Sequence, residues 1–293
     1  MAKKIGLKEL RKVVESEDKW LLARQADHVK RVEKSVLKLQ RDILNGMTRL
    51  RTAKSGELLG VRVNLKQAQK IHRDVVNMFE RDFSAPTKKM VKEFSDVSTR
   101  ITRSYRQLNV SAKFTQMDTA IMNTLQDGVW QDYLALSNTK KNQIVQAMYD
   151  AVISGGDMAG LMTQIEVALM GSEMALGRSL VAMARLYARD GIMIFNQEVN
   201  LYKAEQLEIY HYLYIGDIIG TTRDFCKRRV GKVYTKKQIE SWTFRWAGKS
   251  GPPLTHRGGY NCRHSWRPVK PEWMEGEKRV PVADWNLEQR RRG

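Results

Sequence analysis

The chain has 293 residues, two cysteines and a formal net charge of +19. Two cysteines do not make a disulfide framework, and such sparse use is typical of a reducing compartment. The basic start, MAKKIGLKELRKVVESEDKW, has no apolar run behind it and is not a secretory signal. No window nears the roughly 18 apolar residues of a membrane span. We therefore expect a soluble protein made in a cytoplasm, with no membrane partner.

The charge is unevenly distributed along the chain. Residues 1–106 carry a net charge of +13, residues 107–220 carry −5, and residues 221–293 carry +11. Two basic segments thus flank an acidic middle. Such an excess attracts polyanions, of which nucleic acid is the commonest, although a solvated basic surface without a partner also explains it.

The first basic segment, 1–106, is predicted to form a helical hairpin or arm with a basic outer face. Apolar residues recur at steps of three and four over 7–54, which predicts one long helix or two in tandem. A second helix is expected to begin near Asn64, a good N-cap, and to stop at Ser84–Pro86. A third helix is expected over Lys88–Arg106.

Residues 107–206 are predicted to form a second helical part, with fewer charges and more alanine and methionine. The stretch SGGD at 154–157 separates two helices, and Asp157 is a candidate N-cap. The methionines favour an adaptable core or a subunit contact rather than a ligand site.

The character of the chain changes after Gln206. Residues 207–217, LEIYHYLYIGD, are aromatic and β-branched, which predicts a strand. Capping-box patterns predict two short helices, one opened by Thr221 and one by Thr235. Cys262–Val269 is expected to be a final strand ended by its proline.

The expected fold class is therefore mainly α, with a long helical hairpin or bundle body followed by a small α+β C-terminal domain. The small domain covers 207–270. A basic tail, 271–293, follows it and is expected to be mobile or ordered only on a partner.

Four residues of the small domain are candidate zinc ligands. Zinc prefers tetrahedral sulfur and nitrogen ligands, and a set of two cysteines and two histidines suits it. The set consists of Cys226, His256, Cys262 and His264. Two alternatives stay open: a Cys226–Cys262 disulfide, and two buried thiols that merely pack a helix against the last strand. The packing interpretation is favoured, and no cofactor other than zinc is indicated.

A catalytic function finds little support in the motifs. The chain has no glycine-rich phosphate loop, no H-E-x-x-H helix and no G-x-S-x-G elbow. Acid–base groups such as His256 and Arg263 are present, but nothing in their spacing demands catalysis.

Nucleic-acid binding is the sharper hypothesis, because cations and aromatic residues are interleaved in CKRRVGKVYTKK and HRGGYNCRHSWR. No recognition-helix or RRM motif appears, so the binding is expected to be blind to sequence and sensitive to salt. The candidate DNA-binding residues are Lys227, Arg228, Arg229, Lys236, Lys237, Arg257, Arg290, Arg291 and Arg292.

Three elements of the small domain carry a family resemblance: YLYIGDIIGTTRDFC, GKVYTKKQI and GGYNCRHSWRPV. Together they resemble the C-terminal domain of phage minor head proteins, the head-morphogenesis family named after the F protein of phage Mu and including its SPP1 relative. The resemblance covers about 65 residues. The positions that carry it, besides the two cysteines, are Asp217, Thr222, Arg223, Gly231, Lys232, Val233, Tyr234, Asn261, Arg263 and His264. The last position is His264 where some members have a third cysteine, which leaves only a mixed ligand set.

The resemblance implies a structural minor capsid protein of a tailed bacteriophage, present in several copies inside the virion or at its portal vertex. Such proteins act in capsid assembly or travel with packaged DNA, so the implied partners are the portal, the major capsid protein and double-stranded DNA. It further implies that the motif residues hold the small domain together. An alternative is a phage-encoded nuclease or toxin-like enzyme that uses His256, Arg263 and His264. A third hypothesis is a free basic DNA-binding protein without a capsid.

Overall fold

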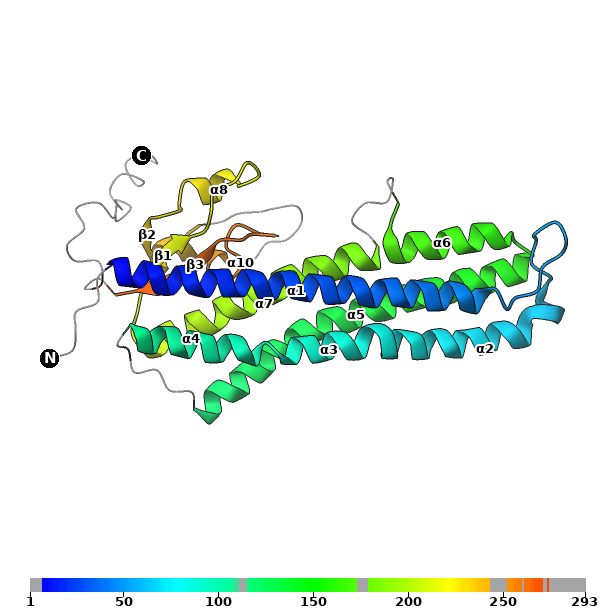
Figure 1. Cartoon of the computed structure of the whole chain (residues 1–293), viewed down its shortest axis with the longest axis horizontal. Helices are drawn as coiled ribbons and strands as arrows, with labels where there is room; N and C mark the ends of the chain where they lie inside the picture. The colour runs from blue at the N-terminus through cyan, green and yellow to red at the C-terminus, as the bar shows by residue number, and fades with distance from the viewer. Residues whose placement is uncertain are drawn as a thin grey trace. The chain divides into compact units, whose positions relative to one another are not determined.

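The computed structural model describes residues 7–108, 110, 115–172, 179–242, 252–259, 261–270 and 273. Within this part the fold is mainly helical, with one small antiparallel sheet near the C-terminus (Figure 1), which confirms the predicted fold class. The helices are α1 (Leu7–Met47), α2 (Val61–Phe79), a π-helical turn (Glu80–Ser84), α3 (Ala85–Lys92), α4 (Ser95–Gln107), α5 (Gln116–Ser154), α6 (Met158–Met170), α7 (Leu180–Gln206), α8 (Asp224–Lys227), α9 (Lys236–Glu240) and α10 (Pro253–His256). The strands are β1 (His211–Ile215), β2 (Val233–Thr235) and β3 (Ser265–Val269).

The chain folds into two compact units, each built from segments that are separate in the sequence. Unit 1 combines residues 1–25, 94–125 and 190–293, and unit 2 combines residues 26–93 and 126–189. The long helices α1, α5 and α7 each contribute to both units.

Unit 2 is a helical bundle that includes the predicted hairpin. The seam positions Val32, Val36, Leu39 and Ile43 of α1 are buried, as their spacing predicts. Four ion pairs join α1 and the turn after it to the antiparallel segment that runs from α2 through the π-helical turn to the end of α3: Arg49–Asp74, Asp42–Arg81, Lys38–Asp82 and Arg31–Glu93. Their order along the two segments shows that the pair is antiparallel.

Two predicted boundaries in this hairpin are wrong. Helix α2 begins at Val61 rather than near Asn64, because the Asn64 side chain is buried and binds the backbone of Arg51. Residues Ser84–Pro86 do not stop the helix. The π-helical turn shifts the hydrogen-bond pattern, and Pro86 then falls in the first turn of α3, where a missing N–H costs nothing.

The α5–α6 junction agrees with the sequence. Helix α5 ends at Ser154, and the Asp157 carboxylate accepts a hydrogen bond from Gly160 N at 2.7 Å as the N-cap of α6. The methionines of α6 are half-buried rather than fully buried.

Unit 1 contains the three-stranded sheet, whose strand order is β2-β1-β3. All pairs are antiparallel, and Tyr212 of the central strand lies between Tyr234 of β2 and Pro268 of β3. The proline is therefore a member of the last strand and does not end it. It is tolerated because β3 is an edge strand, where an N–H is not needed on the outer side.

The two capping-box predictions have different outcomes. Thr235 and Gln238 form the box that opens α9, with both reciprocal hydrogen bonds present. The predicted box at Thr221 is wrong, because α8 begins after Arg223 with no side-chain cap. The Thr222 hydroxyl instead accepts a hydrogen bond from Ile219 N at 2.8 Å and closes the turn before α8.

Candidate metal and thiol site

Three segments of the small domain bring the two cysteines together. Strand β1 carries Tyr214, α8 carries Cys226, and the turn before β3 carries Cys262. Pairing of Tyr214 with Trp266 sets the position of this turn relative to β1. Both thiols are free and buried.

The cluster contains three possible metal ligands. The two cysteine sulfurs are 3.9 Å apart, and His264 Nδ1 is 3.7 Å from Cys262 Sγ. All three ligand atoms lie within 4.8 Å of one another. Zinc bonds of about 2.3 Å to sulfur and about 2.0–2.1 Å to nitrogen, arranged tetrahedrally, need sulfur–sulfur and sulfur–nitrogen distances of roughly 3.8 and 3.5 Å. The group could therefore hold a metal ion with little movement.

The fourth predicted ligand lies apart from this group. His256 is at the end of α10, is only half-buried, and has its Nδ1 3.0 Å from the Thr255 hydroxyl. The structure thus assembles three of the four candidate ligands.

Two glycines let the backbone approach the cluster closely. A Cβ atom on Gly258 would clash with Cys226 Sγ and lie 3.0 Å from Cys262 Sγ. At Gly216, where φ is +140°, a Cβ atom would lie 2.6 Å from the His264 ring. The backbone N–H of Gly258 also donates to Cys262 Sγ at 3.3 Å. Gly216 and Gly258 are therefore part of the site.

Tyr214 closes another side of the cluster. Its hydroxyl lies 3.3 Å from Cys226 Sγ and 3.6 Å from Cys262 Sγ, and its ring stacks on His264 with centroids 5.5 Å apart. Burial and the neighbouring sulfurs raise the pKa of Tyr214 well above its usual value, so the hydroxyl keeps its proton. Tyr214 was not among the predicted site residues. The sequence feature that could have pointed to Tyr214 is its position in an aromatic strand.

The two thiols are electrostatically unequal. The hydrogen bond with Cys262, followed by burial, raises the pKa of Cys226. The same hydrogen bond lowers the pKa of Cys262, with further help from His264. A proton shared between the sulfurs therefore resides on Cys226, and Cys262 is the better anionic ligand.

Two arginines lie near the cluster. Arg223, at the start of α8, donates to Gly258 O at 3.1 Å and so ties the α8 segment to the loop of the second cysteine. Arg257 is only 1% exposed and has a φ of 54°, a left-handed conformation that is uncommon outside glycine. Its position does not fit the predicted role as a contact to DNA phosphates.

The other residues of the family resemblance have varied positions. Thr222 and Tyr234 are buried, and Tyr234 packs edge-on against Trp242 at 4.8 Å. Gly231 adopts a φ of +78° in the turn before β2, where Lys232 O accepts from Tyr214 N. The exposed members are Asp217, Gly231, Asn261 and Arg263, and Lys232 is half-buried.

The predicted DNA-binding cations of the small domain also differ in exposure. Lys227, Arg228 and Lys237 are exposed. The Arg229 guanidinium lies between the rings of Phe225 and Trp242, 3.9 and 4.0 Å from their centroids. Lys236 pairs with Glu205. Arg290, Arg291 and Arg292 lie outside the described residues, as does most of the predicted tail.

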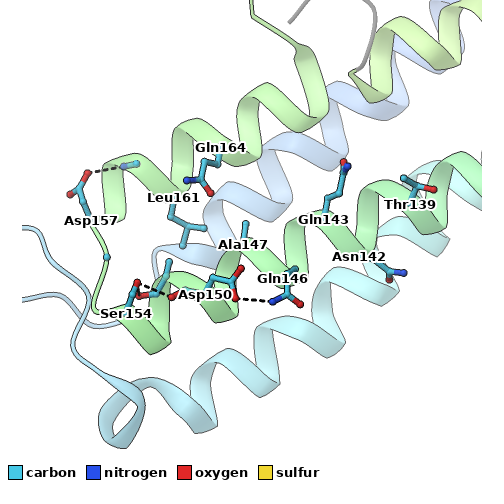
Figure 2. Close-up of a pocket in the computed structure, with 13 residues that line it drawn as sticks. Thr139, Asn142, Gln143, Gln146, Ala147, Asp150, Ser154, Asp157, Leu161 and Gln164 are labelled. Atoms are coloured by element: carbon cyan, nitrogen blue, oxygen red, sulfur yellow. Dashed lines mark hydrogen bonds between the residues drawn. The ribbon is translucent and has the colours of Figure 1, made fainter.

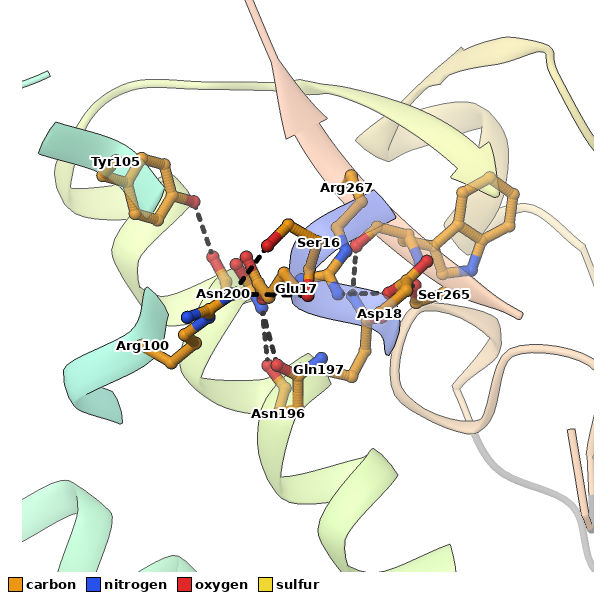
Figure 3. A network of polar contacts seen from close by, with 11 residues as sticks. Ser16, Glu17, Asp18, Arg100, Tyr105, Asn196, Gln197, Asn200, Ser265 and Arg267 are labelled. Carbon is orange, nitrogen blue, oxygen red and sulfur yellow. Dashed lines mark hydrogen bonds and ion pairs between the residues drawn. The ribbon is translucent and has the colours of Figure 1, made fainter. Parts of the chain in front are cut away.

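A buried polar network anchors β3 to the helices of unit 1 (Figure 3). Arg267 is 2% exposed and binds the carboxylates of Glu17 and Asp18 near the start of α1. On α7, the Gln197 amide donates to Trp266 O and accepts from Trp266 N, at 3.1 and 3.0 Å. This amide pairs with the free edge of the sheet as another strand would. Sequence reasoning missed the network because its partners lie up to 250 residues apart.

Unit 2 has a groove of about 950 Å³ between α5 and α6. Its wall is rich in amides, and Figure 2 shows Gln146 donating to Asp150 at 2.7 Å on the α5 side. Gln143 and Gln164 line it as well. The groove contains no cluster of possible metal ligands among the described residues.

Comparisons with protein-family models, with curated proteins and with solved structures gave no significant match for this chain. No helix in the described part of the chain is long and apolar enough to cross a membrane.

Proposed function

We propose that the protein is a structural minor head protein of a tailed phage. In this role it would associate with the portal or the capsid interior during assembly, in several copies per virion, and bind packaged DNA without sequence preference. The observation that carries the proposal is the convergence of the family-like elements on one buried cluster. Tyr214, Arg223, Cys226 and Cys262 come from two of the three elements and contact one another or the same loop.

Burial of this cluster supports a structural role over a catalytic one. Cys226, Cys262 and His264 are 1%, 3% and 4% exposed. A nucleophile or acid–base group has to reach a substrate, whereas groups that hold a small domain together are buried. Of the two histidines in the enzyme alternative, His264 is buried in the cluster and His256 lies outside it.

We further propose that Zn²⁺ binds to Cys226, Cys262 and His264 and acts as a structural clip. A structural zinc site adds its binding free energy to folding, which suits a domain with a three-stranded sheet and few large helices. Cys262, whose pKa is lowered, and Cys226 would be bound as thiolates.

The zinc proposal is tested on the full chain purified without added metal. Elemental analysis is expected to give about one zinc per chain, and thiol titration under denaturing conditions two free thiols. Removal of zinc by a chelator should lower the thermal stability of the domain. Two free thiols without zinc, or a disulfide, would contradict the proposal.

The assembly role is tested by sedimentation of heads from cells that produce the phage components. The chain is expected to sediment with portal or heads at a salt concentration that strips proteins bound only to DNA. A chain that stays at the top of such a gradient would be the free DNA-binding protein of the third hypothesis.

A further inference from the structure

One face of α2 carries a row of four cations. The buried face of this helix consists of Asn64, Ala68, Ile71, Val75 and Phe79. On the opposite face, Arg62, Lys66, Lys70 and Arg73 are all exposed and are spaced by four, four and three residues. With a rise of about 1.5 Å per residue and 3.6 residues per turn, the four cations extend over about 16 Å of the helix in a band about 80° wide.

These four cations are not neutralised by the rest of the described structure. None of them forms an ion pair or a hydrogen bond with a described residue. The only carboxylate within α2, that of Asp74, pairs with Arg49 at 2.7 Å. The contrast with the neighbouring hairpin cations is clear, because Arg31 and Lys38 each have a carboxylate partner.

The row of cations also destabilises α2 itself. Like charges at i and i+4 repel one another, as at Arg62–Lys66 and Lys66–Lys70. Arg62 stands in the first turn, where the helix dipole favours an acidic residue, and this turn has none. Gly60 gives no side-chain cap. A local conflict of this kind, without a compensating contact inside the fold, is typical of a binding surface.

The chemistry of the face suits phosphate groups. The polar residues beside the cations are Gln69 and Asn77, whose amides also donate to phosphate oxygens. Lysine is depleted at the centre of protein–protein interfaces, whereas lysine and arginine in regular rows neutralise the evenly spaced charges of a nucleic acid. We infer that the outer face of α2 binds the phosphate backbone of double-stranded DNA. The inference deepens the proposed function and rests on its DNA-binding part.

The sequence predicted DNA contacts in the C-terminal domain and in the tail after it, and the tail cations lie outside the described residues. In the C-terminal domain, Arg257 is buried, Lys236 is paired, and Arg229 is enclosed by two rings. The exposed cations left in that domain belong to separate short elements, whereas those of α2 share one rigid helix.

Two variants with the same loss of charge provide the test. One replaces the row (R62Q, K66Q, K70Q and R73Q), and the control replaces four exposed cations of the small domain (K227Q, R228Q, K237Q and R263Q). Binding to fluorescent 20-base-pair duplexes of two unrelated sequences is measured by anisotropy at several salt concentrations. The slope of log K against log salt is about −0.9 per phosphate contact. We expect the magnitude of this slope to fall by about three to four in the α2 variant and by less than about one in the control variant.

Several outcomes would overturn the inference. It fails if the α2 variant binds with the wild-type slope, or if the control loses as much. It also fails if polyglutamate competes for α2 as well as DNA does, which would point to an acidic protein partner. Circular dichroism should show unchanged melting. If it does not, the double variant K66Q/K70Q is used and should lose about half as much slope.

The same variants separate this inference from the proposed function. If wild-type protein binds DNA but the α2 row does not matter, the surface assignment alone is wrong. If wild-type protein binds no DNA, the DNA-binding part of the proposed function is wrong too. Sedimentation with heads at high salt reports assembly separately and should not change in the α2 variant.

Discussion

At the scale of single residues, Gly258 determines whether the thiol cluster can form. Replacement by alanine would place a methyl group against both sulfurs, and the backbone has to shift to remove the clash. We expect Gly258→Ala to lower the free energy of unfolding by about 1–3 kcal/mol. Urea denaturation measures the change.

The matched control is Gly128→Ala, because nothing lies within 4 Å of a Cβ atom at Gly128 in the middle of α5. This substitution should be neutral or stabilise the protein by up to about 1 kcal/mol, since alanine is the better helix former. Equal effects of the two substitutions would mean that Gly258 is not packed against the sulfurs.

Asp118 provides a second prediction at the residue scale. It is fully buried, and burial alone would raise its pKa. Hydrogen bonds from Lys203 at 2.8 Å and from Thr115 outweigh burial and lower its pKa to about 2. A lowered carboxyl pKa stabilises the fold above the unfolded value near 3.8, and the stabilisation is lost as the pH falls towards 2. It amounts to about 2 kcal/mol.

Urea unfolding between pH 5 and pH 2 tests this sign. Asp118→Asn should remove this part of the acid sensitivity. At neutral pH it should cost about 3–5 kcal/mol, because Lys203 is left buried without its carboxylate. The control for the loss of one carboxylate is Asp224→Asn at an exposed position, which should change stability at neutral pH by less than about 0.5 kcal/mol. An unaltered acid profile in Asp118→Asn would contradict the assignment.

At the scale of elements, the edge of β3 depends on one side chain of α7. Replacement of Gln197 by methionine keeps the length of the side chain but removes both hydrogen bonds to Trp266. Each buried backbone group left without a partner costs about 1–3 kcal/mol. We therefore expect a large loss of stability in calorimetry. Gln164→Met, on the exposed face of α6, should change stability by less than about 0.5 kcal/mol.

The elements that could be predicted from the sequence are those with local causes. The seam of α1, the Asp157 cap and the Thr235 box each depend on residues a few positions apart. The start of α2 could not be predicted in the same way. Asn64 has the right side chain for an N-cap, but a long-range contact to Arg51 occupies it.

The residue types of the candidate site could be predicted from the sequence, but not which of these residues come together. The spacing of cysteine and histidine indicated the right loop, but spacing alone does not tell whether His256 or His264 is the ligand. The left-handed Arg257 that follows His256, and the pairing of β1 with β3, decide which histidine reaches the sulfurs. Both are properties of the folded chain.

At the scale of the whole molecule, the two units should respond separately to local damage. Cys262→Ser disturbs the cluster of unit 1, and hydrogen exchange should rise in β1, β3 and the start of α1. Exchange in α2 and α6, which belong to unit 2, should stay at the wild-type rate. Ile165→Ala, a fully buried position of α6, should give the reverse pattern. An equal rise in both units would show that they unfold as one.

The buried contacts of Arg267 also fix an order of events during synthesis. Glu17 is synthesised 250 residues before Arg267, so this buried ion pair cannot form until β3 has been made. All segments of unit 2 have been made by residue 189, well before β3. On a ribosome that adds roughly 5–20 residues per second, this gap lasts for several seconds. Any assembly partner that recognises the completed unit 1 therefore selects finished chains over nascent ones.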